Sequence, residues 1–293
     1  MDLIFSITGL FSAFWWSIGG SIIKSSKIKN VLIFSFSESI ISLSVISILI
    51  SFTLGWSIFT KYSTSTYSYL LIGAIFAMSG TVFYIMALRK VPLGITFTVT
   101  TSIVMVITVI LDAFINMLIL NIQILLGGLF ILIGIIIINI FSWKFSNLSD
   151  KSSYLYGVIF CIIAGSSWAF GIFFNDRGLL EADILTATTI RCVIPIIIFG
   201  TVLLMKNNFI DKGITKKEKI IILSSSLCIT MAMLCWYLSL KANSAALTAI
   251  LTSTSPVFAI LWGILFYGEK LRINEIFGII LCLIGSSIIV MGK

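Results

Sequence analysis

The sequence predicts an all-α membrane protein in which ten transmembrane helices form two inverted five-helix repeats around a central cavity. Three observations predict this fold: an apolar composition, ten long apolar runs, and a weak internal repeat. Of the 293 residues, 59% are hydrophobic and 10% are charged. A soluble domain carries about 45–50% apolar and about 25% charged residues. The composition therefore excludes a soluble globular protein, a disordered chain and a secreted disulfide scaffold.

Ten apolar runs are long enough to cross a bilayer, whose hydrocarbon core of about 30 Å needs about 20 helical residues. They are 3–23, 31–54, 67–88, 93–112, 121–140, 154–174, 184–205, 220–239, 244–266 and 273–291. The runs are continuous and lack the inside–outside alternation of barrel strands, so they favour helices. The first run has no basic region before it and no cleavage signal after it, which favours a membrane helix over a removed signal peptide.

The basic residues are shared unevenly between the two sides of the predicted bundle. Arg191 aside, fourteen Lys and Arg residues follow odd-numbered runs, and four follow even-numbered runs or end the chain. Because basic loops tend to stay in the cytoplasm, this distribution places both termini outside. In so apolar a chain, the net charge of +8 indicates loops that set topology and not a nucleic-acid-binding surface.

A shift of 152–153 residues superposes two halves, which we delimit as residues 1–141 and 154–293 with a linker at 142–153. The shift aligns Trp15 with Trp168, Leu88 with Leu240, Arg89 with Lys241, Thr96 with Thr248, and Thr100 with Thr252. With one residue dropped, Gly127 and Gly134 align with Gly278 and Gly285. An odd number of helices per half inverts the second half in the membrane. Inverted repeats are typical of transporters that work by alternating access, with the site between the halves.

Several chemical classes of site are excluded by residues that the sequence lacks. It has no histidine, which excludes His bases, Ser-His-Asp and Cys-His nucleophiles, and His-ligated metals. Five cysteines lie in apolar runs without a C-x-x-C motif and are interpreted as small buried hydrophobes. They are Cys161, Cys192, Cys228, Cys235 and Cys282. We therefore expect no metal, no cofactor and no enzymatic activity.

Glu38 in the second run and Arg191 in the seventh are the charged residues that stand out inside the spans. Charge in the bilayer core costs about 2.5–3.5 kcal/mol on insertion scales and marks functional sites. The 153-residue shift maps Glu38 onto Arg191, so both should face the central cavity, as an ion pair or as a clamp for a solute's carboxylate and ammonium groups. The alternative is that each side chain reaches a nearby interface. Glu38 could also carry protons.

Three further groups of residues are candidates for the cavity or its gates. Hydroxyl side chains recur on one helix face, at Thr96 and Thr100 and again at Thr248, Thr252 and Ser255. Such residues either bind a solute or pack helices closely. Pro195 and Pro256 should kink their helices, as a gate would require. Deep aromatic residues either line an apolar pocket or pack in the core or against lipid. They are Trp15, Trp16, Trp168, Tyr84 and Trp236, with Tyr237 beside Trp236.

The segment 239–287 resembles the end of an EamA domain of the drug/metabolite transporter superfamily. It reads SLKANSAALTAILTSTSPVFAILWGILFYGEKLRINEIFGIILCLIGSS. Small residues follow a basic turn, and then come a mid-helix Pro-Val, a Gly-Glu and a last helix that bears glycines. Residues 87–134 are similar but degraded, with Val104 in place of Pro256 and no match to Glu269. The resemblance implies a ten-helix bundle of two inverted halves, with both termini in the cytoplasm. This orientation conflicts with the charge distribution.

The expected function is secondary transport, most simply export, of a small organic solute such as an amino acid or a related metabolite. No Walker motif is present, so a proton gradient or the solute's own gradient would supply the energy. The expected location is the plasma membrane, with the lipid bilayer as the surroundings. The alternatives are a multidrug or organic cation exporter, an intramembrane enzyme and a non-transporting scaffold.

Overall fold

The structure, a computed structural model, describes residues 7–26, 30–91, 93–115, 117, 121–144, 151–205, 215–267 and 273–291. These residues form helices joined by short connections and contain no strand. The helices of the first half are α2 (Thr8–Ser25), α3 (Val31–Phe52), the 3-10 helix η1 (Trp56–Thr60), α4 (Thr64–Leu88), α5 (Leu93–Phe114) and α6 (Ile122–Lys144). Those of the second half are α7 (Lys151–Leu179), α8 (Ile184–Met205), α9 (Lys216–Ala242), α10 (Ala245–Thr252), α11 (Ser255–Tyr267) and α12 (Ile273–Met291).

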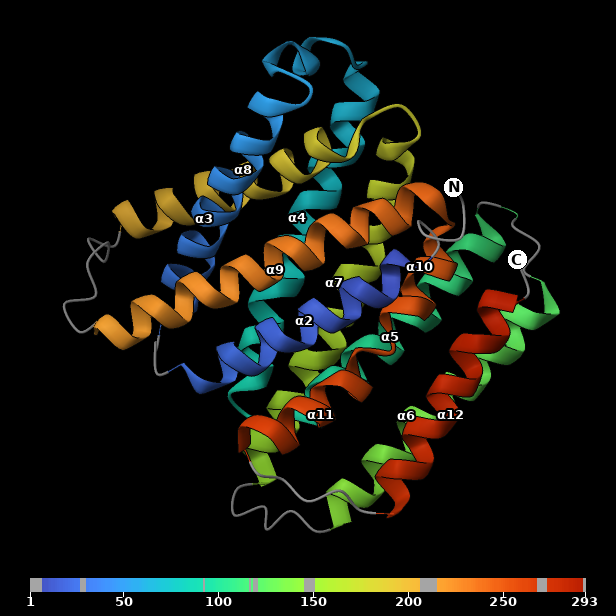
Figure 1. The fold of residues 1–293 in the computed structure, drawn as a ribbon. Helices are drawn as coiled ribbons and strands as arrows, with labels where there is room; N and C mark the ends of the chain where they lie inside the picture. Colours follow the sequence, from blue (N-terminus) through green and yellow to red (C-terminus); the bar gives the residue numbers. More distant parts are fainter. Residues whose placement is uncertain are drawn as a thin grey trace.

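Helices occupy all ten of the apolar runs (Figure 1). Over the described residues, seven helical segments are long and apolar enough to cross a membrane. The all-helical membrane class is therefore confirmed, whereas the count of ten crossings stays a prediction. The start of α9 lies before its apolar run, because Thr215 and Glu218 form a capping box. The Glu218 backbone N–H donates to Thr215 Oγ1 at 3.3 Å, and Glu218 Oε2 accepts from the Thr215 backbone N–H at 2.8 Å.

The ninth apolar run is not one kinked helix but two. Helix α10 ends at Thr252 and α11 begins at Ser255, so Ser253 and Thr254 interrupt the helix. Pro256 lies in the first turn of α11, where its missing N–H costs least. Val104 stands at the equivalent place in α5, which runs unbroken from Leu93 to Phe114. Pro195, by contrast, lies inside a continuous α8.

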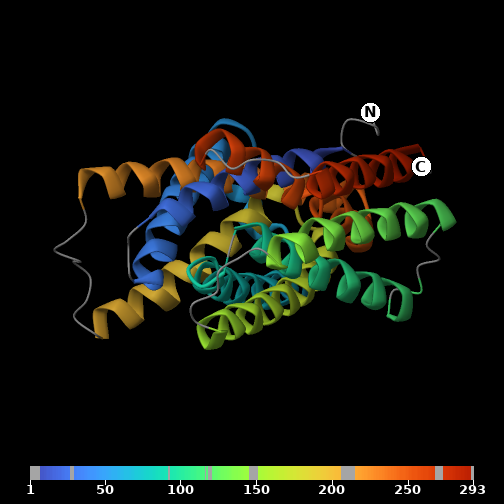
Figure 2. The same ribbon diagram turned by 90° about the horizontal axis from the view of Figure 1, so that it is seen from below.

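The main helix pairs join the two halves of the chain. Helix α2 packs along α9 and α4 along α7, while α5 packs on α7 and α11 on α2. Helix α3 packs on α8, and α6 on α12. The pair α6 and α12 lies side by side at one edge of the bundle (Figures 1 and 2). Suppose that each helix is replaced by the helix at the same place in the other half, such as α2 by α7 and α4 by α9. Each of these contacting pairs then becomes either itself or another pair in the set.

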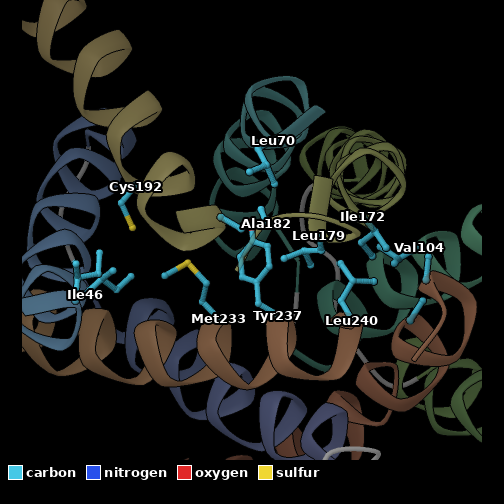
Figure 3. Packing of buried hydrophobic residues seen from close by; sticks show 14 residues of the cluster. Ile46, Leu70, Val104, Ile172, Leu179, Ala182, Cys192, Met233, Tyr237 and Leu240 are labelled. Carbon is cyan, nitrogen blue, oxygen red and sulfur yellow. The ribbon is translucent and has the colours of Figure 1, made fainter. Parts of the chain in front are cut away.

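The largest buried cluster lies where α3, α4, α7, α8 and α9 meet (Figure 3). Tyr237 of α9 is fully buried in it, beside Met233 of the same helix. Cys192 of α8 and Leu70 of α4 face them from the neighbouring helices (Figure 3). This cluster closes one side of the cavities described below.

A glycine contact holds α6 against α12. A Cβ added at Gly285 would lie 2.5 Å from the backbone oxygen of Gly127, which cannot move without displacing its helix. We expect Gly285→Ala to lower the free energy of unfolding by about 1–3 kcal/mol through overpacking, measured as a lower thermal midpoint in detergent. Gly128→Ala is the control, because its Cβ would meet only Ile250 atoms at 3.6 Å or more. Equal midpoints for the two variants would contradict this close approach.

Candidate functional site

A central cavity of about 100 Å³ opens where helices of both halves converge. This volume holds several water molecules, so a small solute group fits. Alanine, glycine and other small residues leave room for this cavity, and three tryptophans form part of its wall. Its lining residues are Ser12, Ala13, Trp16, Ala77, Thr101, Val104, Trp168, Gly171, Ile172, Asn175, Arg191, Ile229, Ala232, Met233, Trp236, Ala249, Thr252 and Ser255. We call it the larger cavity.

A smaller cavity of about 30 Å³ lies beside it. Residues of α3, α4 and α8 form most of its wall. They are Ser35, Glu38, Ser39, Met78, Thr81, Cys192, Pro195 and Phe199. Trp16, Arg191, Ile229 and Met233 line both cavities. These four residues therefore form the partition between the two spaces.

Arg191 is the one charged side chain among the described residues that line the larger cavity. Its guanidinium carbon lies 6.0 Å from the centre of the Trp236 ring, a cation–π distance. The Arg191 side chain also lies close to the Tyr237 hydroxyl, which donates to Asn175 Oδ1 at 3.1 Å. The Asn175 amide in turn donates to the Gly171 carbonyl at 2.7 Å. This chain of contacts ties the Arg191 side chain to α7 and α9.

Glu38 lines the smaller cavity, where the positive charge of Arg191 acts on it. Its carboxylate accepts hydrogen bonds from Ser42 at 3.1 Å and from Ser39 at 3.4 Å. The Ser42 hydroxyl lies 2.8 Å from that of Thr230 on α9. The structure thus brings Glu38 and Arg191 to the wall of one cavity, as the repeat alignment indicates. Only Arg191 of the two also lines the larger cavity.

Aromatic rings from three helices meet on one side of both cavities. Trp16 lies edge-on to Trp168 with ring centres 5.3 Å apart, and Tyr84 packs on both at 5.4 and 5.1 Å. Trp168 donates its indole N–H to the Ala77 carbonyl at 3.1 Å, so this N–H is already occupied. Tyr84 is 1% exposed and lies behind the two tryptophans, outside both linings. Tyr84 therefore contacts the two tryptophan rings without lining either cavity.

The other candidate residues divide between the cavities and helix interfaces. Thr252 and Ser255 line the larger cavity, and Pro195 lines the smaller one. Thr96 and Thr100 instead lie close to the Cys161 thiol of α7, and the Thr100 hydroxyl has no hydrogen-bond partner. Thr248 pairs with Ser239 at 3.2 Å, and Trp15 packs on Phe14. Spacing predicted which residues share a face, but not which neighbour that face meets.

Sequence reasoning named Trp15 and Trp16 together and did not choose between them. Trp16, and not Trp15, lines both cavities, and it lies one turn from Ser12, which lines the larger one. The spacing of four residues between Ser12 and Trp16 is a signal that could have distinguished the two tryptophans. Asn175 was missed, and Tyr237 was named only as the neighbour of Trp236. An amide inside an apolar run is a comparable signal, whereas the contact between Tyr237 and Arg191 is visible only in three dimensions.

Comparisons with known proteins give a family match for the second half of the chain and a fold for nearly all of it. Residues 155–291 match the model of the EamA-like transporter family. Twenty-nine solved chains match this structure. One, described only as a crystal structure of a protein, has a TM-score of 0.75 at 14% identity and covers 99% of this chain and 98% of its own. At that identity the likeness shows the fold alone. No curated protein matches the sequence.

Proposed function

We propose that this protein is a secondary active transporter of small organic solutes. The premise is that the chain is an EamA-like transporter family member through residues 155–291. The observation that carries this proposal is the larger cavity, whose wall comes from α2, α4 and α5 of one half and α7–α11 of the other. A site between two halves is what alternating access requires.

The packing supports a pair of inverted repeats. If α2 is equivalent to α7 and α4 to α9, then the pairing of α2 with α9 is equivalent to that of α7 with α4. The pairings of α5 with α7 and of α11 with α2 are related in the same way. Rocking of one half against the other would then open the cavity to either side. The interruption between α10 and α11, next to Thr252 and Ser255, is the proposed hinge.

We assign the solute-binding roles to side chains that reach the cavities. Arg191 binds an anionic group of the solute, and Glu38 balances its charge when the site is empty. Thr252 and Ser255 offer hydroxyl groups, and Trp16, Trp168 and Trp236 contact apolar parts. Amino acids or related metabolites fit this description better than organic cations do, because the described wall of the larger cavity carries a cation. Export across the plasma membrane is the direction we propose.

Counterflow in proteoliposomes tests the transport function. Vesicles that contain the purified protein are preloaded with one unlabelled solute from a panel of amino acids, organic acids and organic cations, and uptake of the labelled solute is followed. Transient accumulation of at least one solute is expected. Absence of flux for the whole panel would contradict the proposal, and product formation without flux would indicate an enzyme.

The adjacent pair Trp15 and Trp16 offers a matched test of the cavity wall. Trp16→Ala removes a ring that lines both cavities. We expect it to weaken solute binding about tenfold or more, since burying an aromatic ring contributes about 1.5–3 kcal/mol. Trp15→Ala should leave the half-saturation concentration within about twofold of the unmodified protein, because Trp15 lines neither cavity. A larger effect of Trp15→Ala in the counterflow assay would place the site elsewhere.

Orientation follows from labelling of the loop between α8 and α9. The charge distribution places this loop in the cytoplasm together with the other odd-side loops, and the resemblance places it outside. An Asn208→Cys variant without the native cysteines is treated on intact cells with a membrane-impermeant thiol reagent. Protection on intact cells and reaction after lysis support the charge-based orientation. Reaction on intact cells supports the other orientation.

A further inference from the structure

We infer that the solute of the larger cavity is an aromatic monocarboxylate that lacks an amino group. Its carboxylate would bind Arg191, and its ring would lie among Trp16, Trp168 and Trp236. The inference rests on the proposed transport function. Among the small organic solutes proposed there, it selects acids without an amino group and excludes amino acids. It is carried by the charge, the rings and the polar groups of the cavity wall.

The charge of the wall favours a carboxylate. Arg191 reaches the larger cavity, whereas no acidic side chain does so among the lining residues that the structure describes. Glu38 lies in the smaller cavity behind the partition, where Ser39 and Ser42 donate to it. The guanidinium group presents a planar set of donors that matches a carboxylate. An ammonium group in the same cavity would meet the positive charge of Arg191 without an opposite charge in the wall.

The rings of the wall favour a flat apolar body. Trp16, Trp168 and Trp236 come from α2, α7 and α9 and line one space. The rings of Trp16 and Trp168 meet at 79°, which forms a corner against which another ring can pack. The Ala77 carbonyl occupies the Trp168 N–H, so Trp168 offers apolar surface. Apolar cavities of about 150 Å³ bind one benzene, so a volume of about 100 Å³ leaves room for at most one ring.

The Ser255 hydroxyl is a polar group in the wall that is left for a solute. Ser255 is 1% exposed, lines the larger cavity, and its hydroxyl has no hydrogen-bond partner. A buried hydroxyl without a partner costs free energy that a ligand can recover. Asn175, by contrast, is already bonded to Tyr237 and Gly171. The wall therefore combines one cation, one unpaired hydroxyl and a tryptophan corner.

Three probes that differ by one group test the inference. They are phenylalanine, 3-phenylpropionate, which lacks only its amino group, and phenethylamine, which lacks only its carboxylate. Binding is measured as thermal stabilisation of the purified protein in detergent, and transport as counterflow. We expect 3-phenylpropionate to bind at least about tenfold more tightly than phenylalanine, and phenethylamine not to bind. Equal or tighter binding of phenylalanine or phenethylamine would overturn the inference.

Two comparisons make the test specific to the site. 3-Cyclohexylpropionate keeps the carboxylate but not the aromatic ring, and its binding should be weaker than that of 3-phenylpropionate. Arg191→Lys keeps the charge but not the planar donors, so this variant should bind 3-phenylpropionate about tenfold more weakly than the unmodified protein. The Trp15→Phe control should bind 3-phenylpropionate as tightly as the unmodified protein. Unchanged binding to Arg191→Lys would overturn the role of Arg191.

The two readouts separate this inference from the transport proposal. Flux of phenylalanine or an amine without flux of 3-phenylpropionate would overturn the inference and leave the transport function standing. Tight binding of 3-phenylpropionate without flux of any solute would support the inferred ligand and contradict the transport function.

Discussion

Arg191→Gln is expected to lower solute transport about 100-fold, because a hydrogen bond to a charged group is worth about 1.5–3 kcal/mol. Arg191 lines both cavities and interacts with Trp236 and Tyr237. The substitution also leaves the Glu38 carboxylate without its positive neighbour. Breaking a buried ion pair costs about 3–5 kcal/mol, and the interaction of Glu38 with the Arg191 charge is weaker than an ion pair in direct contact. Since Ser39 and Ser42 still donate to Glu38, we expect about 2–3 kcal/mol here.

The double variant Glu38→Gln/Arg191→Gln separates stability from binding. Removing both charges should restore most of the lost thermal stability, because no unpaired charge remains in the membrane. Transport should stay low, since the group that binds the solute's anion is still absent. Recovery of both stability and transport would show that Arg191 serves only to neutralise Glu38. The thermal midpoint and the counterflow rate of the unmodified protein, Arg191→Gln and the double variant decide between these outcomes.

Gly80→Ala is expected to displace the Trp168 ring and so to impair both stability and transport. A Cβ at Gly80 would lie 2.6 Å from Trp168 Nε1 and closer still to Cδ1. The Trp168 indole is also bonded to the Ala77 carbonyl and packed against Trp16 and Tyr84, so it has little room to move. Overpacking of this kind costs about 1–3 kcal/mol, and a displaced ring would fill part of the larger cavity.

Gly128→Ala is the matched control for this effect. It is also a buried helix glycine, but an added Cβ would meet only ordinary contacts at 3.6 Å or more. A gain of about 0.5–1 kcal/mol in helix propensity is expected to leave its thermal midpoint unchanged or slightly raised. If Gly80→Ala retained the midpoint and the counterflow rate of Gly128→Ala, the position of Trp168 in the cavity wall would be wrong.

The sequence predicted the helices well because hydropathy and length decide them in a membrane. The apolar runs coincide with helices even where the chain has no strong caps. Where the helix boundaries differ from the apolar runs, the cause is local hydrogen bonding and backbone chemistry that a hydropathy profile does not include. The capping box at Thr215 and Glu218 lengthens α9 into a charged segment, and Ser253 and Thr254 interrupt the helix before Pro256.

The site was predictable only where symmetry or charge singled out a residue. The repeat alignment brought Glu38 and Arg191 together, and the structure places both at one cavity. Helical spacing did not fix the rotation of each helix about its own axis. As a result, Thr96 and Thr100 lie near Cys161 and not in the cavity wall, and Trp15 lies outside the cavity that its neighbour Trp16 lines. The rotation of a helix about its axis depends on packing with other helices, which local sequence does not contain.

Thiol accessibility of the larger cavity tests the central claim most directly, which is that this space opens to each side of the membrane in turn. In a background without the native cysteines, Thr252→Cys places one thiol in the cavity wall. A membrane-impermeant thiol reagent is applied to right-side-out and to inside-out vesicles, with and without a transported solute. We predict reaction in both kinds of vesicle and protection by the solute in both. Reaction from one side only, or reaction that no transported solute slows, would contradict the account.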